Sequence, residues 1–297
     1  MPTTRSDFSG PRDLREMQAM CSRVWSPTAR FHPGQLAWNR YSQPLDRDGM
    51  GRDEAISLWR VGDEVVGFGW AESPDWLELQ VDPDHPQVAG DVVDWFEDWS
   101  DAPRQSAVAM AGDGVEPVLR EAGFRPEPDG WHFSHHLLDL SELPPVHRVA
   151  GYVLRPVQKD EAALRAAVHR AAWSGLGPSR VTTGAYAQVM HTWPYRSALD
   201  WVACDDQRQL VASALVWLDE ATGVALVEPV GCAPAHRGRG LAGAVTLAAL
   251  HRSRELGAHT AQVSPRGDDD YPGPRRLYQA IGFRPVARTV TWTRSLP

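Results

Sequence analysis

The sequence predicts an α/β fold of two domains, each a mixed, mostly antiparallel sheet flanked by helices. Three observations support this prediction. The apolar periodicity of the second half gives the element order βααβββαβαββ. Two short motifs recur in both halves in the same order. The length of 297 residues, with 42% hydrophobic and 23% charged residues, suits two globular domains better than a disordered chain.

The recurring motifs indicate a duplicated domain. Glu121–Pro126 (EAGFRP) reappears as Ala280–Pro285 (AIGFRP), and each copy precedes a segment rich in Trp, β-branched or aromatic residues. Upstream, Asp82–His85 (DPDH) and Ala233–His236 (APAH) each follow a strand-like stretch. Coincidence between short words is the alternative, but the shared order and similar spacing favour duplication.

The two prolines of Leu143–Pro145 interrupt any regular element and mark the boundary between the copies. We therefore expect one domain over residues 1–145 and a second over residues 150–297, each long enough for its own core.

The expected elements of the second domain follow from alternation, three-to-four spacing and Gly or Pro stops. They are a strand at 152–157, a helix after Asp160, a helix at 183–191, strands at 199–203, 210–218 and 224–232, a helix from Leu241 to Gly257, a strand at 259–264, a helix at 275–280, and strands at 283–286 and 289–293.

The charge balance and the distribution of apolar residues exclude several classes. A net charge of −8 argues against a phosphate-backbone binder and fits a cationic substrate. No apolar run approaches the roughly 18 to 20 residues that cross a bilayer, and the first ten residues do not resemble a signal peptide. We therefore expect a cytoplasmic protein without nucleic-acid or membrane partners.

The cysteines and histidines do not predict a metal site. Cys21, Cys204 and Cys232 are far apart and form no CxxC pair, so they are expected to be plain thiols. His135 and His136 are adjacent on a strand-like segment, where neighbouring side chains point to opposite faces.

The most informative motif is Cys232–Ala242 (CAPAHRGRGLA), between an expected strand and a long expected helix. Glycines let backbone approach a ligand closely, and a helix start offers free N–H groups and a positive dipole end to an anion such as pyrophosphate. The motif is neither GxxxxGK[ST] nor GxGxxG, so the usual nucleotide-hydrolysing and dinucleotide interpretations lose their support.

This motif resembles the R/Q-x-x-G-x-G/A acyl-CoA loop of the GNAT N-acetyltransferase superfamily. Arg237 fills the Arg/Gln position, Gly240 the first glycine position and Ala242 the Gly/Ala position. Leu277–Phe283 (LYQAIGF) resembles the late helix of that family, whose tyrosine faces the CoA sulfur. The resemblance covers residues 152–297, apart from Pro272–Pro274, which stand where the family often has an asparagine that contacts the cofactor.

The resemblance implies direct transfer of an acetyl group from acetyl-CoA to an amine, without an acyl-enzyme. Tyr278 is the candidate general acid for the departing thiolate, the alternative being that its ring only packs. The candidate cofactor-binding residues are Val230, Gly231, Cys232, Arg237, Gly238, Arg239, Gly240, Leu241 and Ala242.

Glu228 is the candidate general base, because a carboxylate on an otherwise apolar strand is costly unless it is used or satisfied. Binding of a cationic substrate without proton transfer is an equally good interpretation. Strand alternation would put Glu228, Val230 and Cys232 on one face of the strand. The acidic run Asp268–Asp270 is expected to be mainly solvated loop.

The first domain is expected to be a degenerate, non-catalytic GNAT-like copy. A constant 151-residue offset sets Ala89 against Gly240, and a 159-residue offset sets Leu119 against Tyr278, so the glycine and the tyrosine are absent. The sequence thus predicts an acetyl-CoA-dependent N-acetyltransferase acting on a primary amine of a small molecule. A non-catalytic acyl-CoA sensor and a protein lysine acetyltransferase are the alternatives.

Overall fold

The computed structural model describes residues 2–45, 53–127, 129–175, 177 and 179–296. The elements of the first half are β1 (Thr3–Asp7), α1 (Pro11–Arg23), α2 (Pro33–Tyr41), β2 (Ala55–Val61), β3 (Glu64–Ser73), β4 (Trp76–Val81), α3 (Val88–Trp99), β5 (Arg104–Met110), α4 (Glu116–Glu121), β6 (Arg125–Glu127) and β7 (Ser134–Asp139).

The second half contains β8 (Val153–Pro156), α5 (Ala162–Trp173), α6 (Thr183–His191), β9 (Asp200–Cys204), β10 (Leu210–Asp219), β11 (Val224–Cys232), α7 (Leu241–Glu255), β12 (Thr260–Val263), α8 (Gly273–Ile281) and β13 (Arg284–Ser295). Short 3₁₀ turns lie at Leu140–Glu142, Ser197–Leu199 and Pro234–His236. This order matches the expected one up to the last element. There, one long strand replaces the two expected at 283–286 and 289–293.

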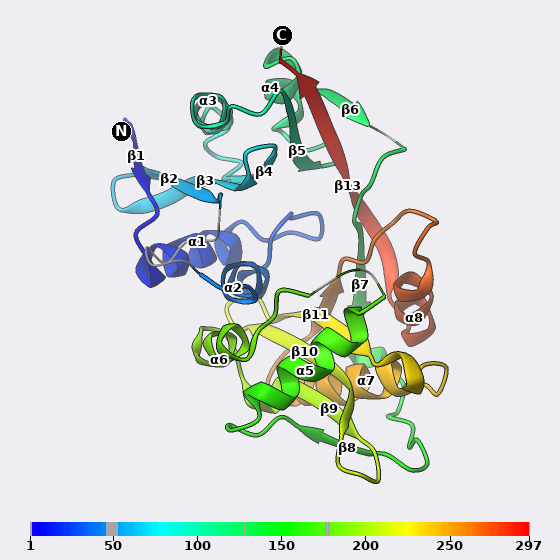
Figure 1. Cartoon of the computed structure of the whole chain (residues 1–297). Helices are drawn as coiled ribbons and strands as arrows, with labels where there is room; N and C mark the ends of the chain where they lie inside the picture. Colours follow the sequence, from blue (N-terminus) through cyan, green and yellow to red (C-terminus); the bar gives the residue numbers. More distant parts are fainter. Residues whose placement is uncertain (1, 46–52, 128, 176, 178, 297) are drawn as a thin grey trace.

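The described strands form a continuous sheet in the order β1-β2-β3-β4-β5-β13-β7-β12-β11-β10-β9-β8, with β6 beside β13 (Figure 1). The pairs β4/β5 and β11/β12 are parallel, and the other described pairs are antiparallel. The expected mixed, mostly antiparallel sheet flanked by helices is therefore confirmed.

The two halves exchange strands at the middle of this sheet. Strand β7, from the first half, pairs with β12 and with Arg284–Arg288 of β13. The rest of β13, Thr289–Ser295, pairs with β5 of the first half. Strand β13 stays continuous because it changes partner along its length instead of turning. The division into residues 1–145 and 150–297 stays a prediction, and the sheet is continuous across it.

The two copies of the repeat have the same local structure. Helices α4 and α8 both end at a left-handed glycine, Gly123 (φ 86°) and Gly282 (φ 116°). The next residue is a buried phenylalanine whose N–H donates to the carbonyl five residues back, from Phe124 to Leu119 at 2.9 Å and from Phe283 to Tyr278 at 3.0 Å. The left-handed position explains why glycine stands at both helix ends.

Helices cover both faces of the sheet in the second half. Helices α7 and α8 pack on one face over Val216, Val227 and Ala261. On the other face, Trp38 of α2 and Tyr186 of α6 pack against Trp217 and Leu226. Within the described residues, no helix is both long and apolar enough to cross a bilayer.

Candidate active site

The site begins where β11 parts from β12. These parallel strands pair only from Val224 with Thr260 to Leu226 with Gln262. Beyond Leu226, β11 keeps its ladder with β10 up to Cys232. One edge of the segment Val230–Cys232 therefore has no neighbouring strand in the described structure. The two strands are thus already apart alongside Val230, Gly231 and Cys232, three of the candidate cofactor-binding residues.

A bulge at Glu228 and Pro229 corrects the expected face of Glu228. Ala214 of β10 pairs with Val230, and Val216 pairs with Val227, so two residues of β11 oppose one of β10. The extra residue reverses the alternation. Val230 and Cys232 consequently pack on the α7 side, as Val227 does, whereas Leu226 packs on the α2 side. The prediction that Glu228, Val230 and Cys232 share a face is wrong.

The loop after β11 has the backbone that its glycines allow. Gly238 (φ 75°) and Gly240 (φ 80°) are left-handed, and Gly240 is the N-cap of α7. An added Cβ at either glycine would meet no atom within 4 Å, so these glycines answer a conformational need and leave open space above the helix start. Gly231 differs, because a Cβ there would lie 2.3 Å from Trp173 and 2.6 Å from Ala172. Glycine is needed at 231 for the close approach of α5.

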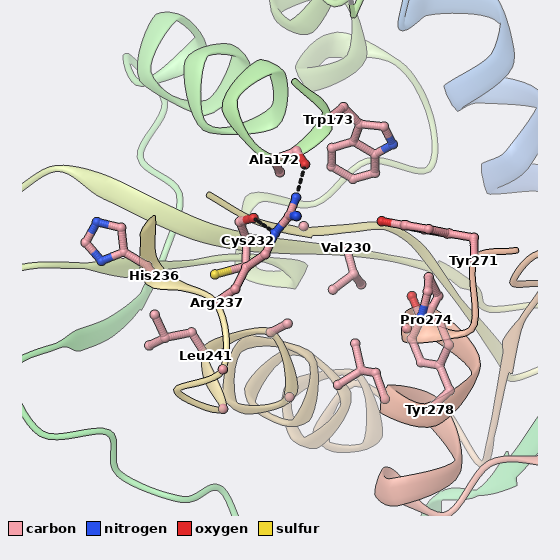
Figure 2. Close-up of a pocket in the computed structure, with 17 residues that line it drawn as sticks. Ala172, Trp173, Val230, Cys232, His236, Arg237, Leu241, Tyr271, Pro274 and Tyr278 are labelled. Carbon is pink, nitrogen blue, oxygen red and sulfur yellow. Dashed lines mark hydrogen bonds between the residues drawn. The ribbon is translucent and has the colours of Figure 1, made fainter. Parts of the chain in front are cut away.

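Arg237 braces this loop. Its Nε donates to the carbonyl of Cys232 at 3.1 Å, and its Nη2 donates to the carbonyl of Ala172 at 2.7 Å (Figure 2). These bonds tie the loop to the end of β11 and to the end of α5. Nearby, Arg239 Nη1 donates to the Tyr152 hydroxyl at 2.8 Å, and that hydroxyl lies 2.9 Å from His236 Nδ1.

A cavity of about 450 Å³ joins the loop to α8 (Figure 2). It is lined by Ala172, Trp173, Val230, Gly231, Cys232, His236, Arg237, Gly238, Gly240, Leu241, Ala242, Gly243, Tyr271, Gly273, Pro274, Leu277 and Tyr278. The structure thus brings the predicted loop residues together with Tyr278, except that Arg239 does not line the cavity. The lining residues Trp173 and Tyr271 were missed in the sequence. Tyr271 is the residue before the Pro272–Pro274 turn, which was the available signal.

Tyr278 lies on the buried face of α8, with its ring edge-on to Phe283 at 5.7 Å between centroids. Burial raises the pKa of its phenol, and the nearby Glu228 carboxylate raises it further. The phenol therefore keeps its proton at neutral pH.

Glu228 lies two residues before the cavity-lining part of β11 and does not line the cavity. Burial raises the pKa of its carboxyl to about 7, against an ordinary value of 4.5, and Arg30 opposes the rise. Glu228 is thus poised between its neutral and charged forms near pH 7, the range that suits a general base.

The acidic run is largely neutralised by neighbouring arginines. Arg266 makes a two-pronged ion pair with Asp268, at 2.9 and 2.8 Å, and Arg275 donates to Asp269 at 2.7 Å. Among the described residues, no group of three or more His, Cys, Asp or Glu side chains has the arrangement of a metal site.

Residues 164–283 match the model of the acetyltransferase (GNAT) family. No curated protein matches. Similar solved structures include a GCN5-related N-acetyltransferase from Sphaerobacter thermophilus, with a TM-score of 0.63 and 18% identity over 99% of this chain and 95% of that one.

Two further structures also align along almost their whole length. A tandem GNAT protein from the clavulanic acid biosynthesis pathway has a TM-score of 0.63 and 18% identity over 99% of this chain and 98% of that one. A GNAT-family acetyltransferase from Colwellia psychrerythraea has a TM-score of 0.60 and 14% identity over 98% and 99%. At these identities the likeness concerns the fold, and together with the family match it shows that this chain carries a GNAT acetyltransferase family domain in its second half.

Proposed function

We propose that the chain is an acetyl-CoA-dependent N-acetyltransferase that moves an acetyl group directly to a primary amine of a small molecule. The observation that carries this proposal is the cavity that joins the start of α7 to Tyr278 along the unpaired edge of β11. It combines an anion-binding helix start, free strand backbone and a protonated phenol in one space.

The residues present fit acetyl-CoA as the donor substrate. Helix α7 has 15 residues, and the space above Gly238 and Gly240 is open, so the backbone amides from Gly238 to Ala242 would hold the pyrophosphate. Backbone N–H groups of Val230–Cys232 on the unpaired edge of β11 would polarise the thioester carbonyl. The donor supplies the activated acetyl group.

Two side chains would move the protons. A protonated amine first gives its extra proton to water. Glu228, ionised, takes a second proton from the nitrogen as that nitrogen bonds to the acetyl carbon and the carbon–sulfur bond breaks, and this proton later replaces the one that Tyr278 gives up. Tyr278 gives its proton to the departing sulfur. The pKa of Tyr278 is raised, so its acid form is populated, and the pKa of Glu228, about 7, leaves a large ionised fraction at neutral pH.

The acceptor proposal rests on charge and enclosure. Glu228 faces the side of the sheet on which α2 packs, and the net charge of the chain is −8, so a protonated amine would be attracted and then deprotonated. The loop between α1 and α2 also lies against β11 and β12 on this side, which favours a small acceptor over a protein.

The test is an assay of CoA release from acetyl-CoA with polyamines, aminoglycosides, amino-sugar thiols and amino acids. We expect release with at least one amine, at a rate that rises as pH increases through about 7, because Glu228 must lose its proton. Glu228→Gln should lose most activity near neutral pH and partly recover at alkaline pH. Tight binding of acetyl-CoA without release for any amine would contradict the proposal.

A further inference from the structure

The loop between α1 and α2 of the first half, residues 24–32, is fastened to both strands of the catalytic opening. His32 Nε2 donates to the carbonyl of Val224 on β11 at 3.2 Å. Its Nδ1 accepts from the Gly34 amide at 3.0 Å, which fixes the tautomer. At the other end, Trp25 Nε1 donates to Gln262 Oε1 on β12 at 3.2 Å. The loop therefore spans β11 and β12 close to the point where they separate.

Between these two anchors the loop carries a buried arginine. Arg30 is 3% exposed, and its Nη2 donates to Glu78 of β4 at 2.7 Å. Its guanidinium lies over the rings of Phe31, at 4.6 Å, and Phe133, at 5.5 Å. The Nε and Nη1 atoms have no hydrogen-bond partner, so part of the cationic group is left uncompensated in a low-dielectric setting.

Glu228 lies on the same side of the sheet as this loop. The bulge in β11 turns Glu228 away from α7 and toward the side where Ala37 and Trp38 of α2 cover Leu226. Burial raises the pKa of Glu228 to about 7, and the Arg30 charge holds it lower than burial alone would. A buried positive charge from the first half and the carboxyl of Glu228 therefore lie on the same side of the sheet, at the opening between β11 and β12.

Arg30 is the positive charge that acts on Glu228, and it also acts on a second carboxyl, that of Glu72 on β3. Loss of solvent and the Glu78 charge raise the pKa of Glu72 to about 7, and Arg30 opposes the rise.

The remaining described neighbours of Glu228 and Arg30 supply no further positive charge. Tyr278, from α8, keeps its proton because burial and Glu228 raise its pKa. His135, from β7, stays neutral because burial and Arg30 lower its pKa to about 3. Trp217, from β10, donates at 2.7 Å to the backbone carbonyl of Glu228 and not to the carboxylate.

We propose that Arg30, held by Glu78, is a positioning residue by which the first half keeps the proton-accepting group of the second half ionised. This inference rests on the proposed role of Glu228 in acetyl transfer. It gives the non-catalytic half an electrostatic part in the reaction besides its part in the fold.

Three variants of the full chain test the inference by their opposite signs. Arg30→Met should move the titration of Glu228 to higher pH, because the stabilising positive charge is lost. Glu78→Gln should move it to lower pH, because Arg30 is then less compensated. Arg30→Lys should stay close to wild type. Below the titration range, each unit of upward shift should lower kcat/KM about tenfold.

Two measurements follow the titration of Glu228: the pH profile of kcat/KM and the ¹³C chemical shift of its carboxyl carbon. The signal of this carbon is identified as the one that is missing in Glu228→Gln. Arg40→Met is the matched control, since Arg40 is also a buried first-half arginine, paired with Glu54 at 3.7 Å, and should leave the titration unchanged. Equal titration of Glu228 in wild type, Arg30→Met and Glu78→Gln would overturn the inference. If Arg30→Met does not fold, Glu78→Gln decides.

The carboxyl titration also separates failure of this inference from failure of the proposed function. A chain that acetylates no amine but whose Glu228 titration shifts as expected would retain the coupling and lose the proposed reaction. A chain that acetylates amines with an unshifted titration would keep the reaction and lose the role of Arg30.

Discussion

Both halves lead a strand into a long helix through a turn of one pattern, yet their strands differ in length. The backbone N–H groups of Asp82 and Ala233 each donate to a carbonyl of the neighbouring strand at 2.8 Å. In each turn a second hydrogen bond follows: the N–H of His85 donates to the carbonyl of Asp82 at 2.8 Å, and the N–H of His236 donates to the carbonyl of Ala233 at 2.9 Å. Strand β4 has six residues, whereas β11 has nine. In each strand, three residues pair with the neighbouring parallel strand. The part of β4 that continues past this pairing is therefore half as long as the corresponding part of β11.

In the first half, the region beside the end of β4 is occupied by tightly packed side chains. Val88 and Trp95 of α3 lie so close to β3 that a Cβ at Gly67 or Gly69 would stand 2.6 and 2.7 Å from them. Asp82 is buried and paired with Arg23 at the end of α1. The same order of elements therefore forms a cavity in the second half and a packed core in the first. The length of one strand and the side chains around it make the difference.

The comparison also corrects one matched position. Helices α3 and α7 begin at Val88 and Leu241, so their N-caps, Gln87 and Gly240, correspond. The constant 151-residue offset wrongly set Ala89 against Gly240, because the turn between Asp82 and α3 is shorter than the turn between Ala233 and α7. When the two halves are matched by their parallel strand pairings, the neutral Gln80 of β4 corresponds to Glu228 of β11.

The largest expected effect concerns the tyrosine that the first half replaces with Leu119. Tyr278→Phe should lower turnover about 10²- to 10⁴-fold with little change in acetyl-CoA affinity, if the phenol supplies the proton. Steady-state kinetics and calorimetry measure the two quantities separately. Wild-type turnover in this variant would mean that the ring only packs.

Next in size is the exchange of strands between the halves. Trp292 of β13 is 1% exposed and packs in the core of the first half with Trp95 and Phe124. Trp292→Ala should lower the free energy of unfolding by about 3–5 kcal/mol, measured in urea, although residue 292 lies in the last part of the sequence. Trp131→Ala, at a tryptophan 36% exposed, is the control. A loss for Trp292→Ala below about 1 kcal/mol would argue against this packing.

The helix starts give a sharper comparison of function. Gly240→Asp places a negative charge and a strained left-handed residue at the N-cap of α7, so acetyl-CoA affinity should fall by about 100-fold or more. Gln87→Asp, at the exposed N-cap of α3, should leave affinity unchanged. Calorimetry of both variants measures this, and equal affinities would remove the loop assignment.

The smallest effect concerns stability at the position where the first half has Gln80. The folded-state pKa of Glu228, about 7, lies above its ordinary value of 4.5, so ionisation costs stability. That cost is absent below pH 4.5, grows as pH rises to about 7 and is complete above it. Glu228→Gln should therefore be more stable than wild type at pH 8, by about 1–3 kcal/mol, and similar at pH 4.5. Equal stability at pH 8 would contradict the raised pKa of this carboxyl.

Local patterns in the sequence determined most of the second half. The helix at 183–191 and the strand at 224–232 have the bounds that alternation and proline stops predict. The glycine-containing loop, the helix that starts at Leu241 and the helix that carries Tyr278 were also found from the sequence, since each depends on residues within a few positions. The left-handed conformation of Gly240 and the burial of Tyr278 came from the structure. The same holds for the matching ends of α4 and α8.

The tertiary structure alone decided which segments meet. Nothing local to β7 or β13 shows that each crosses to the other half, because strand pairing is a long-range choice. The bulge that turns Glu228 away from Val230 depends on the register of β10, and alternation alone gave the wrong face. The buried Arg30 likewise lies on a loop that is far from β11 and β12 in sequence, and only the contacts of His32 and Trp25 in the folded chain bring that loop to these two strands.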